Sequence, residues 1–297
     1  MPDSVRASTR CGTVVLAGRP NAGKSTLLNR LVGEPLAIVS RKPQTTRQAV
    51  IGIRTDEHIQ LIFVDLPGLL EPSYLMQHIM LDEAVAALRR ADAVLYLHPL
   101  AEGTPPPLTD VLPHAGVLRA PCRTVLTKAD LVPAERREAL AEDRLAVSAR
   151  SGEGLDALLA WCRDRMPPGP LRHDPEDLST QPLRFFAAEF AREAAFHHLG
   201  AELPYALAAE TDEFREGSQP LYIRVILYVE RESQKGMVIG KRGRTIKAIG
   251  SDTRARLEAF LGTPVYLDLW VKTLAKWRSD ATALRRFGFS VPGTKGQ

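Results

Sequence analysis

Short apolar runs alternate with amphipathic stretches through the first two-thirds of this 297-residue chain. Each apolar run predicts a buried strand, at residues 13–17, 59–64, 93–97, 124–126 and 145–147. Helical periodicity between these runs predicts helices at residues 21–31, 76–90, 135–143 and 154–165. A strand-helix repeat of this kind is typical of an α/β domain with a mostly parallel sheet.

The order of predicted elements changes after a proline-rich interruption, where residues 166–170 read MPPGP and polar residues follow. We therefore place a first domain at residues 1–170, a linker at 171–182 and a second domain at 183–297. The second domain is predicted to contain a helix at 185–199, strands at 205–211 and 221–230, an apolar stretch at 237–239 before a glycine-rich turn, a helix at 245–260 and a strand at 265–272. This α-β-β-α-α-β order predicts a smaller α+β domain.

The composition is that of an ordinary globular protein. It is 44% apolar and 25% charged, no run of 18 apolar residues occurs, and the polar N-terminal ten residues have no apolar stretch behind them. The three cysteines form no C-x-x-C pair and none of the seven histidines has a metal-ligand spacing, so neither a disulfide framework nor a zinc site is indicated. We expect a cytoplasmic protein.

Charge is distributed unevenly along the chain. Residues 221–297 hold 15 Lys and Arg against 6 Asp and Glu, a net charge of +9, whereas residues 1–220 hold 24 against 29, a net charge of −5. A basic end on a slightly acidic protein is expected when that end meets a polyanion such as RNA. From the charge alone, the alternative is a basic face that contacts only solvent and binds no polyanion.

Residues 18–25 read GRPNAGKS, which matches the pattern G-x-x-x-x-G-K-[ST] between a predicted strand and a predicted helix. The glycines let backbone N–H groups surround phosphate oxygens, Lys24 adds positive charge at the β- and γ-phosphates, and Ser25 can bind Mg²⁺. Taken alone, the motif could also be a fortuitous glycine-rich turn. The residues expected at the phosphates are Gly18, Asn21, Ala22, Gly23, Lys24, Ser25 and Thr26.

A second group of residues is placed to bind the metal and the γ-phosphate. Asp65 ends a predicted strand, where a carboxylate can hold Mg²⁺ through water, and the backbone N–H of Gly68 can contact the γ-phosphate. The polar loop at residues 40–47 contains two threonines, of which we favour Thr46, with Thr45 as the alternative, for closing over Mg²⁺ and the γ-phosphate. The expected metal ligands are therefore Ser25, Thr46 and Asp65.

Two further motifs are suited to guanine. Asp130, in the run Thr127-Lys128-Ala-Asp130, could accept hydrogen bonds from the guanine N1–H and exocyclic amine, donors that adenine lacks there. Ser148 and Ala149 follow the next strand, where the Ala149 N–H can meet guanine O6. The complete set resembles the translation-factor-like GTPases and specifies GTP rather than ATP.

Beyond the nucleotide motifs, the sequence resembles the Era family of bacterial ribosome-assembly GTPases. The resemblance reaches from about residue 12 to 278 and rests on GRPNAGKSTLLN at 18–29, SRKPQTTR at 40–47, PED at 175–177, LPY at 203–205, VIGKRG at 238–243 and LDLWVK at 267–272. It implies a P-loop GTPase domain followed by a type II KH domain, slow GTP hydrolysis with Mg²⁺, and binding near the 3′ end of small-subunit ribosomal RNA during maturation of the small ribosomal subunit. It also implies peripheral association with the cytoplasmic face of the inner membrane, and we expect a monomer.

The chain departs from the family pattern at four places. Thr127 stands where asparagine is usual, which we expect to weaken contacts to the base and to the P-loop. Leu66 replaces the usual threonine, Arg242 replaces a glycine, and the proline-rich residues 101–107 differ from the family's usual chain.

A KH module uses its G-x-x-G turn to bring the RNA backbone close to two helix ends, beside an apolar groove. Gly240 and Gly243 would allow that approach. Phosphate-directed charge would come from Lys241, Arg242, Arg244 and Lys247, whereas Ile239 and Ile246 would pack the helices beneath the groove. We interpret Trp270 and Trp277 as core residues rather than base-stacking platforms.

Hydrolysis is expected to be in-line attack of water on the γ-phosphorus. Leu69 and Leu70 follow Gly68, so no side chain there can orient the water as a glutamine would. Asn21 occupies a position that resembles that of GTPases whose asparagine helps bind K⁺, and we hypothesise the same here; equal turnover in sodium and potassium would refute this. The expected catalytic residues are Lys24, Thr46 and Gly68.

Two functions use these same residues. The first is an RNA-binding assembly factor whose release follows GTP hydrolysis. The second is a membrane-surface signalling GTPase whose KH-like module docks a protein partner. Loss of RNA binding with intact GTP binding, after changes in the G-x-x-G turn, would distinguish the first from the second.

Overall fold

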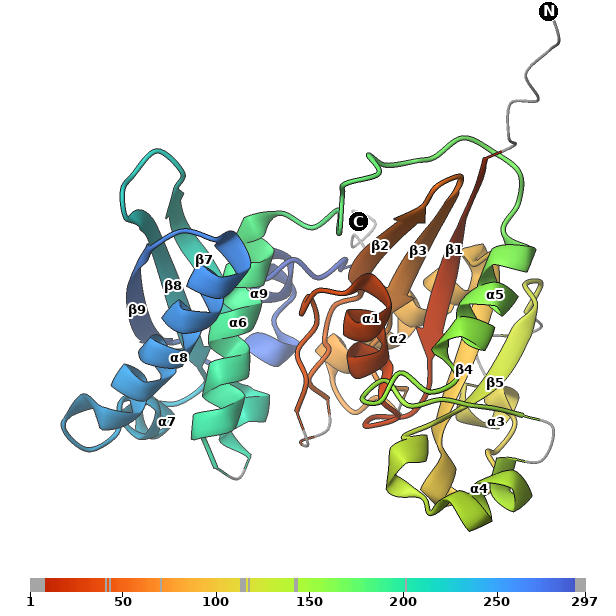
Figure 1. Ribbon diagram of the computed structural model, residues 1–297. Helices are drawn as coiled ribbons and strands as arrows, with labels where there is room; N and C mark the ends of the chain where they lie inside the picture. Colours follow the sequence, from red (N-terminus) through yellow and green to blue (C-terminus); the bar gives the residue numbers. More distant parts are fainter. Residues whose placement is uncertain are drawn as a thin grey trace, which may run out of the picture. The chain divides into compact units, whose positions relative to one another are not determined.

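The computed structural model describes residues 9–291, apart from 41, 43, 70, 113–115, 117, 142–143 and 201 (Figure 1). Contacts divide the chain into two compact units. The first comprises the chain up to Ala37 together with Thr46–Glu71 and Leu81–Thr180. The second comprises Ile38–Thr45, Pro72–Met80 and the chain from Gln181 onward. None of the helices in the described part of the chain is long and apolar enough to cross a membrane.

The first unit is built on a six-stranded sheet in the order β2-β3-β1-β4-β5-β6. Its strands are β1 (Arg10–Ala17), β2 (Val50–Asp56), β3 (Ile59–Asp65), β4 (Ala93–Pro99), β5 (Cys122–Thr127) and β6 (Leu145–Ala146). All pairs are parallel except β2 with β3, which is antiparallel. The predicted mostly parallel α/β sheet is therefore confirmed. Strand β2 was not predicted from the sequence.

Helices cover both faces of this sheet (Figure 1). They are α1 (Lys24–Val32), α2 (Leu75–Arg90), α3 (Leu108–Val111), α4 (Ala134–Ala141) and α5 (Leu155–Arg165). The second half of α2 contributes Ala84, Val85 and Leu88 to a buried cluster with residues of β1 and β4. Because both faces are covered, all residues of β4 are buried, as its continuous apolar pattern predicts.

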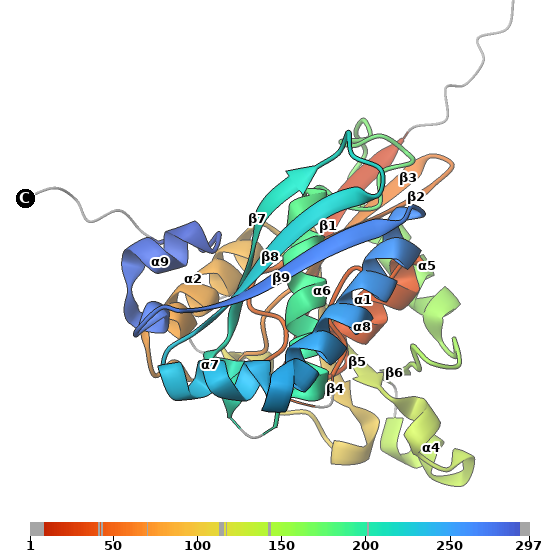
Figure 2. The same ribbon diagram turned by 90° about the vertical axis from the view of Figure 1, so that its left-hand side faces the viewer.

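The second unit contains the three-stranded sheet β7-β8-β9 (Figure 2). Its elements are α6 (Leu183–His198), β7 (Ala208–Arg215), β8 (Leu221–Val229), α7 (Glu232–Ile239), α8 (Arg244–Leu261), β9 (Val265–Thr273) and α9 (Ala281–Arg286). Strand β7 is antiparallel to β8, and β8 is parallel to β9. Helices α6 and α8 pack together, with Phe186 and Phe190 of α6 against Phe260 of α8. The predicted α-β-β-α-α-β order is confirmed, with α9 added after it.

The two tryptophans of the second unit lie in different environments. Trp277 lies beyond β9, is fully buried and donates from its indole N–H to the carbonyl of Ala206 at 2.9 Å, so its prediction as a core residue is confirmed. The same prediction for Trp270 is wrong, because its side chain is 51% exposed. Leu269 faces α8, so Trp270 points to the other face of the sheet, where its N–H donates to Asp268 at 2.7 Å.

The most deeply buried residues of α7 and α8 are not the two isoleucines named from the sequence. Ile239 and Ile246 are only half-buried. The fully buried positions are Val238 and Ile249, each one turn or less away. Val238 and Ile249 are therefore the core positions of the two helices. The packing role expected for Ile239 and Ile246 beneath the groove stays a prediction.

Candidate functional site

The loop after β1 leads directly into the N-terminus of α1. Gly23 precedes this helix in a left-handed conformation, with φ of 89°, and no side chain caps the helix. The first N–H groups of α1 therefore have no intrahelical acceptor, which is the arrangement that binds phosphate. Lys24 is buried, and its ammonium donates to the carbonyls of Gly18 and Arg19 at 3.1 and 3.0 Å. Burial lowers the pKa of Lys24, while Asp65 acts in the opposite direction.

The three predicted metal ligands meet at one point. Ser25 Oγ donates to Asp65 Oδ2 at 2.7 Å and lies 2.9 Å from Thr46 Oγ1, and Thr46 donates to the same carboxylate oxygen at 3.2 Å. Thr45 instead offers its backbone carbonyl to Arg192, at 2.5 Å. The structure thus brings the hydroxyl of Thr46, the favoured threonine, to Ser25 and Asp65.

This cluster suits Mg²⁺ chemically. Asp65 is buried, and its Oδ1 atom has no hydrogen-bond partner within the part of the chain that the structure describes. Burial raises the pKa of Asp65 to about 6. A carboxylate oxygen without a donor, beside two hydroxyl oxygens, is a hard-oxygen set of the kind that binds Mg²⁺, and a divalent cation would favour the ionised carboxylate.

The segment after β3 lies against the P-loop. The N–H of Leu69 donates to the carbonyl of Gly18 at 3.1 Å. A Cβ atom at Gly68 would lie 2.8 Å from backbone atoms of Pro20, so only glycine fits there. Leu66 and Leu69 are both buried in the core of the first unit. Burial explains why position 66 holds an apolar residue, and it keeps the side chain of Leu69 away from solvent. Leu70 lies outside the described residues.

The two guanine-directed loops are tied to the P-loop and to each other. Thr127 Oγ1 donates to the carbonyl of Ala22 at 2.7 Å. Ser148 Oγ donates to Asp130 Oδ1 at 2.7 Å, which orients the carboxylate. Lys128, which lies between Thr127 and Asp130 in the chain, has a left-handed backbone conformation with φ of 58°. Thr127 therefore keeps a contact with the P-loop through its hydroxyl. The weakening expected relative to asparagine stays a prediction.

The remaining predicted nucleotide residues surround these groups. Asn21 is exposed and left-handed, with φ of 61°, at the outer part of the P-loop. Thr26 is exposed in the first turn of α1. Ala149 follows the fully buried Ser148 and is half-buried.

In the second unit, the G-x-x-G turn joins α7 to α8. Gly240 has φ of 72°, and a Cβ atom there would lie 2.2 Å from Thr245 Oγ1. Arg242 is also left-handed, with φ of 53°. The predicted phosphate-directed cations are all exposed on this turn and the following helix: Lys241, Arg242, Arg244 and Lys247.

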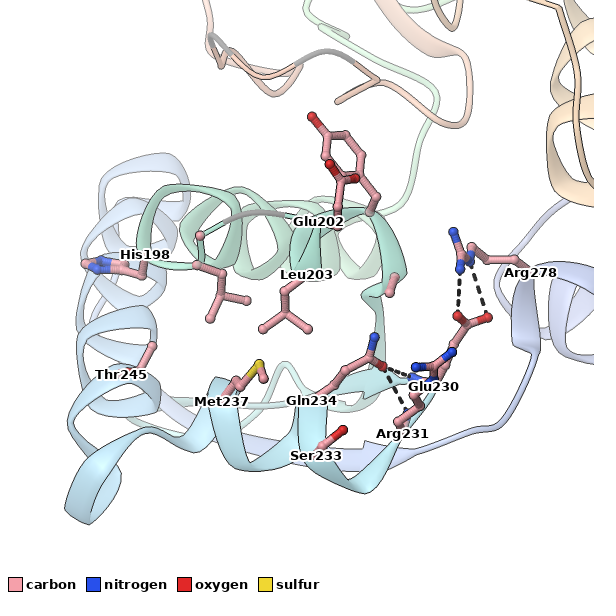
Figure 3. Close-up of a pocket in the computed structure, with 14 residues that line it drawn as sticks. His198, Glu202, Leu203, Glu230, Arg231, Ser233, Gln234, Met237, Thr245 and Arg278 are labelled. Atoms are coloured by element: carbon pink, nitrogen blue, oxygen red, sulfur yellow. Dashed lines mark hydrogen bonds and ion pairs between the residues drawn. The ribbon is translucent and has the colours of Figure 1, made fainter.

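Beside this turn lies a cavity of about 690 Å³, which we call the α6–α7 groove (Figure 3). Its walls come from the end of α6 and the following loop, the residues between β8 and α7, α7 itself, the start of α8, and Arg278. Leu199, Leu203, Tyr205 and Met237 give it apolar surface, and Met237 is 61% exposed. The groove is therefore lined by both apolar and polar side chains, as a site for an unpaired base would be.

None of the eight residues predicted to bind RNA lines this groove, although they lie on the adjoining turn and helices. The one sequence signal for the opposite wall is the LPY run at 203–205, which contributes to the family resemblance. The residues that line the groove, none of which was predicted as an RNA contact, are His198, Leu199, Gly200, Glu202, Leu203, Tyr205, Ala206, Glu230, Arg231, Ser233, Gln234, Met237, Thr245 and Arg278.

Comparisons with known proteins show the same two parts. The family model described as 50S ribosome-binding GTPase matches residues 13–128, and the KH domain model matches residues 202–278. GTPase Era from Carboxydothermus hydrogenoformans is 38% identical over 294 residues, covering 95% of this chain and 99% of that protein. GTPase Era from Pseudomonas aeruginosa PAO1 is 36% identical over 304 residues, covering 97% and 98%.

Two solved structures are similar along nearly the whole chain. One is a crystal structure of an Aquifex aeolicus Era variant bound to GDP·AlF4⁻, with a TM-score of 0.90 and 34% identity, covering 95% of this chain and 100% of that one. The other is Era in complex with MgGDPNP and nucleotides 1506–1542 of 16S ribosomal RNA, with the same TM-score, identity and coverage.

Proposed function

Because the chain belongs to the Era family of GTPases, we propose that it binds the 3′ region of small-subunit ribosomal RNA and assists maturation of the small ribosomal subunit. It is a GTPase with a KH domain. A related Era was solved with nucleotides 1506–1542 of 16S ribosomal RNA. The observation in this chain that carries the proposal is the α6–α7 groove beside four exposed cations.

For GTP hydrolysis, we assign the phosphates to the P-loop amides and Lys24, and guanine to Asp130 and the Ala149 N–H. Mg²⁺, bound by Ser25 and Thr46 with Asp65 acting directly or through water, would neutralise charge on the β- and γ-phosphate oxygens. The Gly68 N–H would donate to a γ-phosphate oxygen as water attacks in line.

For RNA binding, the exposed Lys241 and Arg242 would contact backbone phosphates at the turn. Arg244 and Lys247 extend this basic surface along α8. The apolar side chains of the α6–α7 groove would receive unpaired bases, because every base has an apolar face to stack. We assign this role to the module at residues 183–297.

The test is fluorescence anisotropy of a labelled oligonucleotide that matches the 3′ end of small-subunit ribosomal RNA. The double variant Lys241→Glu with Arg242→Glu should weaken binding by about tenfold or more near 100 mM salt, because it reverses two phosphate-directed charges. Lys272→Glu is the matched control: Lys272 is exposed on β9 with the same alternation as Trp270, on the sheet face turned away from α8. Absence of RNA binding by the wild-type protein would favour protein docking instead.

We further propose that K⁺ assists hydrolysis at Asn21, whose exposed, left-handed position at the P-loop suits a cation contact near the phosphates. No glutamine follows Gly68 to orient the water. A bound cation would lower the barrier in another way, by stabilising negative charge at the transition state. Turnover should be higher in potassium than in sodium, and Asn21→Ala should remove that difference. Equal turnover in both salts would contradict the role of K⁺.

The proposed setting is the cytoplasm, with the protein acting as a monomer and contacting the inner membrane only peripherally. The net charge of +9 on residues 221–297 supports contact with an anionic surface. Flotation with vesicles of anionic lipid, compared with neutral lipid, tests the membrane contact. Light scattering after size-exclusion chromatography tests the monomer.

A further inference from the structure

The face of the β7-β8-β9 sheet that is turned away from α8 carries exposed aromatic side chains (Figure 2). Tyr266 and Trp270 lie on β9 and are 57% and 51% exposed. Tyr222 on β8 is paired with Tyr266, and the two rings stack with their centres 5.7 Å apart and 13° between their planes. We call Tyr222, Arg224, Tyr266 and Trp270 the aromatic face. Large rings that stay exposed side by side are typical of an interaction site.

Two arginines lie over these rings. The guanidinium of Arg215 is 4.6 Å from the centre of the Tyr222 ring. That of Arg224 is 5.6 Å from the Tyr222 ring and 6.0 Å from the Trp270 ring. A guanidinium is attracted to the face of an aromatic ring, and because it is planar it can itself stack on a nucleobase. The arginines therefore extend the flat surface that the rings provide.

The carboxylate of Asp268 occupies the polar atoms of this face. It accepts hydrogen bonds from the Tyr222 hydroxyl and from Arg224 Nε, both at 2.9 Å. Its other oxygen accepts the indole N–H of Trp270 at 2.7 Å. These donors are used within the face, so the face offers a partner mainly ring surface. Such a surface suits stacking on bases more than hydrogen bonding to their edges.

Helix α9 limits the aromatic face at one end. Ile226 and Tyr228 of β8 are buried in one cluster with Leu284 of α9. Lys272 is paired with Tyr228, so it lies at this covered end and outside the aromatic face. The open part of the sheet therefore extends from Trp270 to the start of β9.

Charge and position favour unpaired RNA as the partner of this face. Residues 221–297 carry a net charge of +9, which attracts a polyanion. Strand β9 is at the edge of the sheet and packs against α8, so one strand separates the basic surface of α8 from the aromatic face. On the face itself Arg215 is paired with Glu213, and Arg224 with Asp268. Stacking would therefore contribute more than charge to binding at this face.

We propose that the aromatic face is a second RNA site of the KH domain, on which unpaired bases stack against Tyr266, Trp270 and the Tyr222–Arg224 pair. This inference rests on the proposed binding of RNA by this domain. Aromatic side chains on neighbouring strands of a sheet hold about two or three bases in other RNA-binding domains. The site would lengthen the bound segment beyond the roughly four nucleotides that a G-x-x-G turn clamps.

Two lengths of RNA distinguish this site from the turn. Oligonucleotides of about four nucleotides, enough for the turn alone, and of about 12 are titrated by fluorescence anisotropy, both taken from the 3′ end of small-subunit ribosomal RNA. A non-hydrolysable GTP analogue is present at saturation throughout. Tyr266→Leu and Trp270→Leu each remove a ring, whereas Tyr266→Phe and Trp270→Phe are the matched controls that keep one. Thermal unfolding verifies that each variant folds.

Each leucine variant should weaken binding of the long RNA by about fivefold or more, which corresponds to one lost base stack, and should bind the short RNA as the wild type does. The phenylalanine variants should keep most of the affinity. Because the face is nearly neutral, the loss should be similar at about 50 and 200 mM salt. Loss of a phosphate contact would instead become smaller as salt increases.

The fluorescence of Trp270 reports contact with this face directly. The other two tryptophans, Trp161 and Trp277, are buried, with 9% and 0% of their surface exposed. The long RNA should quench the emission of Trp270 and protect it from acrylamide, and the short RNA should do neither. Both effects should be absent in Trp270→Phe.

Three results would overturn the inference. The first is unchanged affinity of both leucine variants for the long RNA. The second is emission from Trp270 that the long RNA does not alter, which would leave a protein as the partner of this face. The third is an equal loss of affinity for both lengths, which would mean that the rings support the fold around the turn. Failure of the underlying function gives a different result, in which the wild-type protein binds neither RNA.

Discussion

The hydroxyl of Thr127 donates to the backbone carbonyl of Ala22 at 2.7 Å, although the two residues are 105 positions apart in the chain. This bond joins the loop that faces the guanine to the loop that faces the phosphates. Thr127 is buried, so water cannot replace the donor easily. The hydroxyl thus keeps the base and phosphate sites in a fixed relation where the family usually has asparagine.

Thr127→Val should weaken the affinity for GTP and GDP alike. The change keeps the shape but leaves the Ala22 carbonyl without its donor, a loss of about 1–3 kcal/mol, or about 5- to 150-fold in affinity. Thr127→Ser, which keeps the hydroxyl, is the control and should stay within a few-fold of the wild type. Titration with fluorescent GDP measures both, and equal affinity of the valine variant would show that the bond does not support nucleotide binding.

Asp65→Asn should make the nucleotide-free, metal-free protein more stable while abolishing GTP hydrolysis. Burial raises the pKa of Asp65 from 3.8 to about 6, so ionising this carboxyl at neutral pH costs the folded state about 3 kcal/mol relative to the unfolded chain. The folded pKa is the higher one, so this cost is absent below pH 4, grows between pH 4 and 6, and is complete above that.

Urea unfolding of both proteins in EDTA at a series of pH values tests this prediction. The stability advantage of Asp65→Asn should be largest above pH 6 and should disappear near pH 4. Added Mg²⁺ with GDP should reverse the order, because only the carboxylate can favour the cation. An advantage that does not vary with pH would contradict the role of ionisation.

Gly68→Ala should slow hydrolysis more than it weakens GDP binding. A Cβ atom at this position would lie 2.8 Å from the Pro20 backbone, so the segment must move away from the P-loop. The Gly68 N–H then no longer points at the γ-phosphate, and losing one such donor lowers kcat on the order of 10²-fold. Single-turnover hydrolysis measures the rate, and a fall in GDP affinity as large as the fall in rate would indicate general disruption instead.

The sequence predicted the features that depend on neighbours in the chain. The P-loop, the strand that ends at Asp65 and the G-x-x-G turn each combine a local backbone shape with a local residue pattern. Strand β2 was not predicted because its sequence, VIGIRTD, alternates apolar and polar residues only weakly. Its pairing with β3 decides its structure instead.

Features that depend on distant segments could not be predicted. Thr46 was favoured from the sequence, but Thr45 stayed open as the alternative, because the positions of Ser25 and Asp65 after folding decide between the two. Arg192 and Glu193 look like solvated charges on a helix, yet they are buried because Ile38–Thr45 covers them. The groove wall at the end of α6 is likewise far in sequence from the G-x-x-G turn.

The two glycines of the G-x-x-G turn should respond differently to substitution. A Cβ atom at Gly240 would lie 2.2 Å from Thr245 Oγ1 and 3.0 Å from the Thr245 backbone nitrogen, whereas one at Gly243 would meet nothing within 4 Å. Gly240→Ala should therefore distort the start of α8 and lower both the stability of the KH domain and its RNA affinity. Gly243→Ala creates no clash, but the alanine must adopt the left-handed backbone conformation, which costs roughly 1–2 kcal/mol of stability.

Thermal unfolding and RNA anisotropy of the two alanine variants test this difference. Gly243→Asn should recover most of the stability lost in Gly243→Ala, because asparagine tolerates the left-handed conformation, and no residue with a Cβ should rescue position 240. Equal behaviour of the two positions would contradict the geometry of the turn. The same geometry makes an aspartate at 240 a poor test of RNA contact, since the turn would be distorted before any phosphate were repelled, and favours charge reversal at Lys241 and Arg242 for that purpose.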